Sequence, residues 1–105
     1  DVLGGLVGSE MCIRDRAEGA EWAIAAGVVN SDLVFSVRNR GYVRAAGEVV
    51  RAVVEGLGVG GGHRSMAKGI IPLKAFRKVY KRADRATIRA ALLEAFVRAI
   101  HPDDS

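Results

Sequence analysis

From residue 21 onward, two consecutive stretches of the chain alternate between apolar and polar residues. The first runs from Glu21 to Val29 and the second from Leu33 to Asn39. A period of two is typical of half-buried β-strands. The polar segment Asn30–Asp32 between them favours a turn, so the sequence predicts a β-hairpin. One face carries Trp22, Ile24, Ala26, Val28, Leu33, Phe35 and Val37, and the opposite face of the second strand carries Val34, Ser36 and Arg38.

The rest of the chain has mainly helical periodicity. The spacing predicts an amphipathic helix over Tyr42–Leu57, a short strand over Gly69–Leu73, a basic helix over Lys74–Ala83 and a last helix over Arg85–Ile100. Asp84 is suited to cap that last helix. The predicted order is strand, strand, helix, glycine loop, strand, helix, helix. We therefore expect an α/β fold with a small mixed β-sheet, of three or more strands, covered by amphipathic helices.

Composition narrows the function without fixing it. The 105 residues suit one domain, and the net charge of +4 favours an anionic partner such as a phosphate, a nucleotide or a nucleic acid. An arginine-rich composition without functional meaning would give the same charge. The single cysteine excludes an internal disulfide, and no apolar run reaches the roughly 20 residues of a membrane helix. We expect a cytoplasmic protein with no membrane contact.

The segment "GVGGGHRS" (Gly58–Ser65) is the most unusual stretch of the chain. Three consecutive glycines suit a backbone with positive φ, or one that a ligand approaches closely. Successive N–H groups could form an anion-binding concavity, and a helical turn beginning near His63 would add to it. Arg64 could hold a phosphate with two hydrogen bonds. The spacing fits neither a Walker A loop nor a GxGxxG motif, and a flexible turn remains the simpler alternative.

Three segments in this order, "LVFSVRN", "AGEVV" and "GGGHRSMAKGIIP", resemble the DHHA1 domain. This is the C-terminal substrate-binding domain of DHH-family phosphoesterases. The family includes RecJ-like exonucleases, nanoRNA and phosphoadenosine phosphate phosphatases, and cyclic-dinucleotide phosphodiesterases. The resemblance covers roughly Ala17–Leu73, with helical continuation to Ile100, so we expect residues 17–105 to form a DHHA1-like domain.

The resemblance implies a set of substrate-binding residues. The glycines and His63 match the family's GGGH loop, which approaches the phosphate and sugar of the substrate. Arg38 matches a strand arginine that binds the far end of the substrate, and Arg64 is an additional phosphate contact. Lys68 departs from the small residue expected at its position. The expected binding residues are Ser36, Arg38, Asn39, Gly60, Gly61, Gly62, His63 and Arg64.

Catalysis in this family requires a DHH domain, whose aspartates and histidines hold a divalent metal, usually manganese, that activates water. This chain contains no Asp-His-His run, no catalytic pair and no metal site that we can identify from the sequence. We therefore expect a fragment that binds a nucleotide or short oligonucleotide, packs against a DHH domain and is inactive alone. The substrate (nanoRNA, phosphoadenosine phosphate, cyclic dinucleotide or single-stranded DNA) and the oligomeric state stay open.

A second interpretation is an RNA-binding module, because DHHA1-like domains also occur at the C-terminus of alanyl-tRNA synthetases. A basic stretch supports it, although an ordinary solvated helix surface would look the same. Its residues are Lys74, Arg77, Lys78, Lys81, Arg82, Arg85 and Arg89.

The first 16 residues have no clear periodicity. Residues 6–16, "LVGSEMCIRDR", resemble the translation of a sequencing adapter. We therefore expect residues 1–16 to be a non-native leader, with residues 1–5 of undetermined origin.

Overall fold

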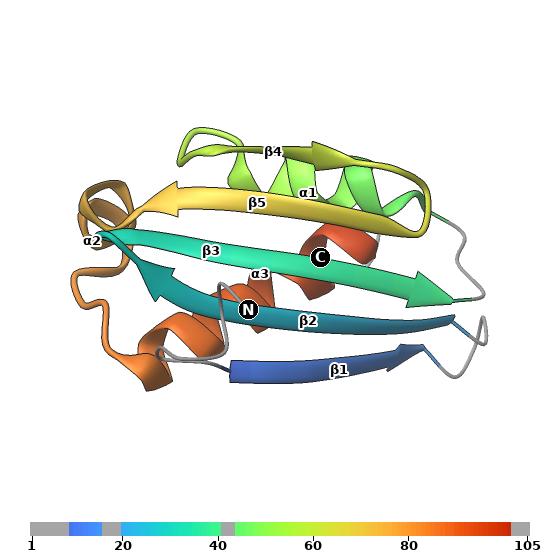
Figure 1. Cartoon of the computed structure of the whole chain (residues 1–105). Helices are drawn as coiled ribbons and strands as arrows, with labels where there is room; N and C mark the ends of the chain where they lie inside the picture. Colours follow the sequence, from blue (N-terminus) through green and yellow to red (C-terminus); the bar gives the residue numbers. More distant parts are fainter. Residues whose placement is uncertain (1–8, 16–19, 41–43, 102–105) are drawn as a thin grey trace.

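The chain forms an α/β fold in a computed structural model that describes residues 9–15, 20–40 and 44–101. Within these residues, five strands make one sheet in the order β1-β2-β3-β5-β4, and three helices pack against it (Figure 1). The expected fold class is confirmed, and all four strand pairings are antiparallel. The elements are β1 (Ser9–Asp15), β2 (Ala20–Val29), β3 (Asp32–Arg40), α1 (Ala46–Val54), β4 (Val59–Gly62), β5 (Met66–Pro72), α2 (Leu73–Tyr80) and α3 (Arg85–Ile100).

The predicted hairpin is present as β2 and β3. Its turn consists of Asn30 and Ser31, which both have positive φ, 49° and 70°. Two such residues twist the chain in the sense that joins antiparallel strands directly. The pairing aligns Val29 with Asp32 and Trp22 with Asn39. The apolar alternation therefore points to one side of the sheet, as the sequence predicted.

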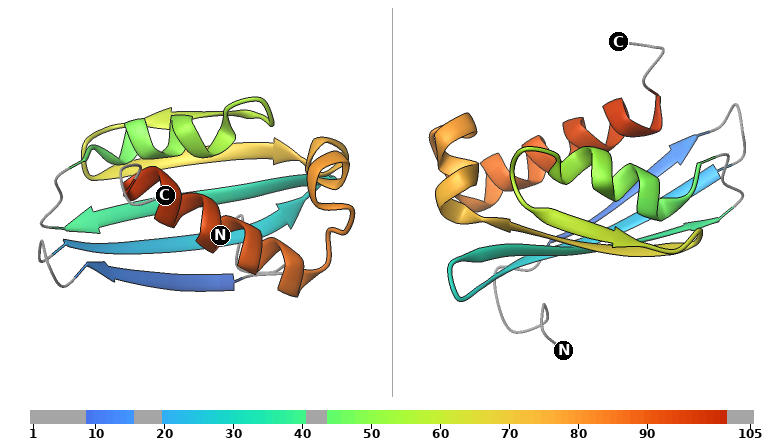
Figure 2. Two further views of the ribbon diagram at one scale, coloured as in Figure 1. Left: turned by 180° about the vertical axis from the view of Figure 1, so that it is seen from behind. Right: turned by 90° about the horizontal axis from the view of Figure 1, so that it is seen from above.

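Helices α1 and α3 cover that apolar side, and no helix of the described residues lies on the opposite side of the sheet (Figure 2). Helix α2 lies at one end of the sheet, opposite to the β4–β5 turn (Figure 1). Phe35 on β3 and Phe96 on α3 are fully buried and pack edge to face, with ring centroids 5.6 Å apart. Such a pair adds about 0.5–1.5 kcal/mol beyond the burial of its area. It fixes α3 against the centre of the sheet.

Helix α1 is shorter than the predicted Tyr42–Leu57. Residues 42 and 43 lie outside the described residues, and Arg44 and Ala45 are not helical. The helix begins at Ala46 because carbonyls of the turn that follows β4 satisfy its first amides. It ends at Val54, two residues before Gly56, whose φ of 77° leaves the helical region.

Helix α3 begins where the sequence predicted. The Asp84 carboxylate accepts hydrogen bonds from the Thr87 backbone N–H at 3.4 Å and from the Thr87 hydroxyl at 2.6 Å. The hydroxyl bond is the main reason that the pKa of Asp84 is lowered from 3.8. The preceding helix is Leu73–Tyr80 rather than Lys74–Ala83, because Lys81 takes up a left-handed φ of 69° and ends it.

The glycine segment is a strand, and the expectation of a helical turn near His63 is wrong. Val59–Gly62 form β4, which pairs with β5 along its whole length. Strand β5 itself begins at Met66, three residues earlier than predicted. The glycines therefore belong to the sheet, and the turn that follows them is short.

Strand β1 had no counterpart in the sequence prediction. Residues Ser9–Asp15 pair antiparallel with β2, opposite Ala20–Ala26. Ile13 is half-buried against the core, whereas Cys12 is exposed. The segment is thus part of the sheet, and its adapter origin stays a prediction.

Candidate functional site

The face of the sheet opposite to α1 and α3 brings segments that are distant in sequence into adjacent rows. Ser36 on β3 aligns with Lys68 on β5, which in turn aligns with Gly61 on β4. Arg38 aligns with Met66 in the next row. Directly opposed residues point to the same side of a sheet, and diagonal neighbours lie about 7–8 Å apart, within reach of long side chains. The basic groups of Arg38 and Lys68 therefore share one patch of this face.

This patch lines a cavity of about 440 Å³, which we call the open-face cavity. Its charged side chains are Arg38 and Lys68, and no carboxylate is among its described lining residues. Neither cation forms an ion pair or hydrogen bond with a described residue. Among the described residues, therefore, nothing neutralises the positive charge of this cavity. Its lining residues are Ser36, Val37, Arg38, Gly61, Gly62, His63, Met66, Ala67 and Lys68.

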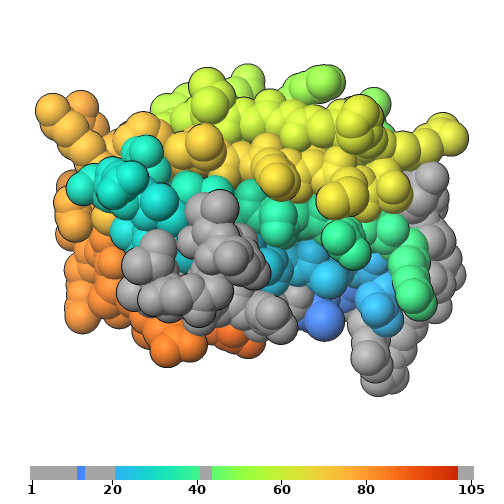
Figure 3. Space-filling model, viewed as in Figure 1, coloured from blue at the N-terminus to red at the C-terminus, as the bar shows by residue number. Residues whose placement is uncertain are grey.

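The turn from His63 to Ser65 borders the cavity and is held by backbone hydrogen bonds on several sides. The His63 N–H donates to Met66 O at 2.7 Å, which closes the turn. Ser65 O accepts from the Asn39 N–H at 3.1 Å, which ties the turn to the end of β3. Such bonds fix the backbone while the side chains of the turn remain exposed. Figure 3 shows this face, with β4 and β5 beside β3.

The same turn also satisfies the start of helix α1. The amides of Ala46 and Gly47 donate to the carbonyls of Arg64 and His63, at 2.8 and 2.9 Å. Two of the helix's first amides are therefore occupied from within the chain. Gly60–Gly62 are extended, and among the described glycines only Gly56 has positive φ. The concavity of successive N–H groups expected from the sequence does not form.

The structure brings together five of the eight residues expected to bind substrate. Arg64 is exposed on the turn but does not line the cavity. Gly60 lines a neighbouring depression at the outer edge of β4. Asn39 faces the helix-covered side of the sheet. The five that line the open-face cavity are Ser36, Arg38, Gly61, Gly62 and His63.

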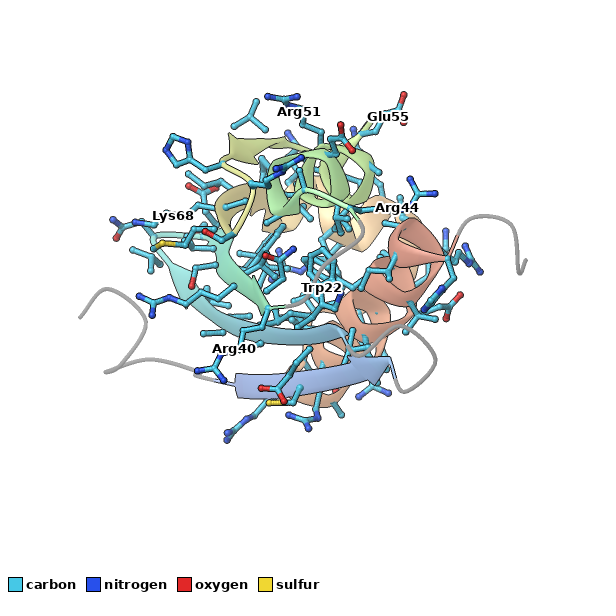
Figure 4. The ribbon with its side chains drawn as sticks, turned by 90° about the vertical axis from the view of Figure 1, so that its right-hand side faces the viewer. Trp22, Arg40, Arg44, Arg51, Glu55 and Lys68 are labelled. Carbon is cyan, nitrogen blue, oxygen red and sulfur yellow. The ribbon has the colours of Figure 1, made fainter. Side chains whose placement is uncertain are left out.

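Asn39 is a structural residue in this arrangement. The residue is 6% exposed, and its Nδ2 donates to Arg44 O at 3.1 Å. Arg44 Nε in turn donates to Ile100 O, also at 3.1 Å, which satisfies a carbonyl at the end of α3. Asn39 Oδ1 and Nε1 of its register neighbour Trp22 are buried without a partner in the described residues. Figure 4 shows Trp22 between the sheet and the helices.

Sequence reasoning missed Lys68 as a site residue. The resemblance marked Lys68 as a departure from the expected small residue, and the structure places its side chain on the open-face cavity (Figure 4). Alternation along β5 could have found it, because Ala67 and Ile71 are buried while Met66, Lys68 and Ile70 are exposed. The sequence alone did not show that β5 pairs with β3, which is what brings Lys68 next to Arg38.

The basic surface lies away from the cavity. By this term we mean the seven cations of α2, of the segment that follows it and of the start of α3: Lys74, Arg77, Lys78, Lys81, Arg82, Arg85 and Arg89. Its seven residues are all exposed. Arg82 pairs with Asp84 at 3.2 Å, whereas four other members have no ion pair with a described residue. These four are Lys74, Arg77, Lys78 and Lys81.

Metal sites and membrane spans are absent from the described part of the chain. These residues contain no group of three or more His, Cys, Asp or Glu side chains that could hold a metal ion. They also include no helix long and apolar enough to cross a membrane.

Comparison with known proteins adds no relative. No protein-family model matches this chain, and neither the curated proteins nor the solved structures give a significant match. The resemblance to the DHHA1 domain therefore stays a prediction, carried by the residues quoted for it.

Proposed function

We propose that the open-face cavity binds the phosphate groups of a nucleotide or short oligonucleotide, as the substrate-binding domain of a DHH-family phosphoesterase. One observation carries the proposal. Arg38 and Lys68 project from neighbouring strands into a cavity whose described lining has no carboxylate. Two like charges that line one cavity repel one another, and a phosphate dianion bound between them would relieve that repulsion.

Each lining residue has a distinct part in this proposal. The guanidinium of Arg38 can donate two parallel hydrogen bonds to phosphate oxygens, and Lys68 acts as a point charge. Ser36, in the same row as Lys68, supplies a hydroxyl donor. The exposed imidazole of His63 and the bare edge of Gly61 and Gly62 offer contacts for the sugar or base.

Under this proposal, the chain binds and orients the substrate but does not cleave it. Hydrolysis would be performed by a DHH domain that packs against this one and holds a divalent metal. The lone cysteine and the nucleotide ligand both fit a cytoplasmic setting.

Isothermal titration with a 5′-phosphorylated trinucleotide tests the binding proposal. We expect Arg38→Ala and His63→Ala to weaken binding, the former by about tenfold or more because a charge-assisted hydrogen bond is removed. Arg98→Ala is the matched control, since Arg98 pairs with Glu94 on the exposed side of α3, outside the cavity. Binding that is unchanged in both cavity variants would show that the site is wrongly assigned.

RNA binding by the basic surface is a second candidate function. It is supported by the four exposed cations that have no ion-pair partner among the described residues. Binding of this kind releases counterions, so its affinity falls steeply as salt rises. Titration of a longer single-stranded RNA at several salt concentrations would test it. A salt dependence that is identical after neutralising Lys74, Lys78 and Lys81 would exclude this surface.

A further inference from the structure

Gly61 is the one glycine of β4 whose presence the fold does not explain. At Gly60 a Cβ would lie 2.7 Å from Val50 Cγ1, and at Gly62 it would lie 2.5 Å from Ala67 Cα. At Gly61 a Cβ would meet only Arg51, with Nε at 3.5 Å and Nη2 at 3.9 Å, which is ordinary contact. Its φ does not require glycine either. With no side chain at Gly61, a ligand could lie against the strand and contact the Arg51 guanidinium beside it.

The guanidinium beside Gly61 belongs to Arg51 of helix α1. This side chain reaches past β4 at the edge of the sheet, and Figure 4 shows it at the top of the molecule, away from Lys68. Its helical spacing to Glu48 and Glu55 predicts ion pairs, yet Arg51 forms none with any described residue. Arg51 is therefore a further exposed cationic group next to the glycine strand, and it has no ion-pair partner among the described residues.

Strand β4 separates two hollows. On one side lies the open-face cavity, which Gly61 lines. On the other lies a depression of about 460 Å³ that includes Arg51, Gly60 and the carboxylate of Glu55. Residues 60–62 of β4 carry no side chains, so only the backbone of the strand lies between Arg51 and the cations of the open-face cavity. A ligand crossing at Gly61 would contact both.

We infer that Arg51 forms a second anion-binding subsite, so that the site takes a nucleotide chain with two separated phosphates rather than a single phosphate. One phosphate binds Arg38 and Lys68, the linking sugar crosses β4 at Gly61, and the next phosphate binds Arg51. The Glu55 carboxylate repels anions from the far part of the depression and so restricts the second phosphate to the Arg51 end. This inference rests on the proposed function of the cavity.

Titration of two ligands, a nucleoside 5′-monophosphate and a 5′-phosphorylated trinucleotide, tests the inference. We expect the unchanged protein to bind the trinucleotide about tenfold more tightly, in keeping with one added charge-assisted hydrogen bond. Arg51→Gln should remove that preference while leaving the affinity for the monophosphate unchanged. Arg98→Gln is the matched control and should keep the preference. Gly61→Val should keep the thermal midpoint of the protein but weaken trinucleotide binding, since its side chain blocks the crossing.

The outcomes separate this inference from the proposal beneath it. If Arg38→Ala weakens both ligands while Arg51→Gln and Gly61→Val leave the preference intact, the second subsite is wrong and the cavity stands. If Arg38→Ala and His63→Ala change nothing, or if neither ligand binds the unchanged protein, both proposals fall.

Discussion

The open-face cavity and the basic surface are both cationic, but they are assembled differently. In the cavity, Arg38 and Lys68 are 30 positions apart in the sequence and meet because β3 pairs with β5. On the basic surface, the seven cations follow one another within residues 74–89 and all are exposed on or beside two helices. The first arrangement depends on the fold, whereas the second is already present in the local sequence.

This difference separates two kinds of binding. Side chains rooted on hydrogen-bonded strands lose little backbone freedom when a ligand arrives, which favours a defined geometry. Long cations on an exposed helix attract any polyanion and are screened by salt. The cavity should therefore recognise a particular phosphate geometry, and the basic surface should respond mainly to charge density.

The largest expected effect comes from removing two charges at each place in turn. Arg38→Ala combined with Lys68→Ala should weaken trinucleotide binding about 100-fold, because two charge-assisted hydrogen bonds to phosphate are removed. Arg77→Ala combined with Lys78→Ala lowers the net charge equally and should weaken it less than about threefold at about 0.15 M salt. Isothermal titration measures both. Equal reductions in affinity for the two double variants would show that general electrostatics, and not the geometry of the cavity, accounts for binding.

A slightly smaller effect is expected on stability when the glycines of β4 are filled. Gly62→Ala places a Cβ 2.5 Å from both Ala67 Cα and Met66 O, so the β4–β5 pair must shift. The free energy of unfolding should fall by about 1–3 kcal/mol, as overpacking generally costs. Gly61→Ala, one residue away, should change it by no more than about 0.5 kcal/mol. Urea unfolding of both variants measures this, and equal stabilities would contradict the geometry of β4.

The third effect appears in salt dependence. Replacing Lys74, Lys78 and Lys81 by Gln should lower the slope of log affinity against log salt, for a longer single-stranded RNA, by about 0.7 for each phosphate that is no longer neutralised. The trinucleotide slope should hardly move, since the open-face cavity, its proposed binding site, lies away from these lysines. Fluorescence anisotropy at several salt concentrations gives both slopes. If the trinucleotide slope fell as much as the RNA slope, the cavity and the basic surface would have to act as one binding surface.

The smallest effect concerns pH, at the junction between the basic surface and α3. The hydrogen bond from Thr87 lowers the pKa of Asp84 from 3.8, so the carboxylate stabilises the fold above that pH. The contribution is lost as the pH falls through the lowered pKa. Asp84→Ala should therefore reduce the thermal midpoint at neutral pH, and the difference from the unchanged protein should shrink in strong acid. A difference that persists unchanged under acid conditions would assign the effect to something other than the charged cap.

Local periodicity predicted those parts of the fold whose cause is local. The alternation around Phe35 identified β3 and the face that is buried, and Asp84 identified the start of α3. Both signals depend on side chains within a few residues of one another. Of the cavity residues that the sequence did suggest, Arg38 came from that alternation and the family resemblance, and His63 from the glycine-rich segment and the same resemblance.

What the sequence did not predict depends on non-local pairing. The glycines of β4 were interpreted as a loop because glycine is rare in strands, and only packing against Val50 and β5 explains two of them. Lys68 and Arg51 could be placed at the cavity or beside Gly61 only after the strand order was known. In strand β1 only Met11 and Ile13 alternate with more polar residues, which is too short a pattern to indicate a strand, and the strand is recognised by its pairing with β2.

The carbonyls of His63 and Arg64 that satisfy the first amides of α1 have a consequence for dynamics. The turn cannot move away from the helix without breaking the hydrogen bonds of the Ala46 and Gly47 N–H groups. Turn and helix should therefore open together, as one cooperative unit in hydrogen exchange. A ligand that holds the turn would then slow the exchange of those two amides, although it touches neither. The hydrogen-exchange rates of these two amides of α1 should therefore report ligand binding on the opposite face of the sheet.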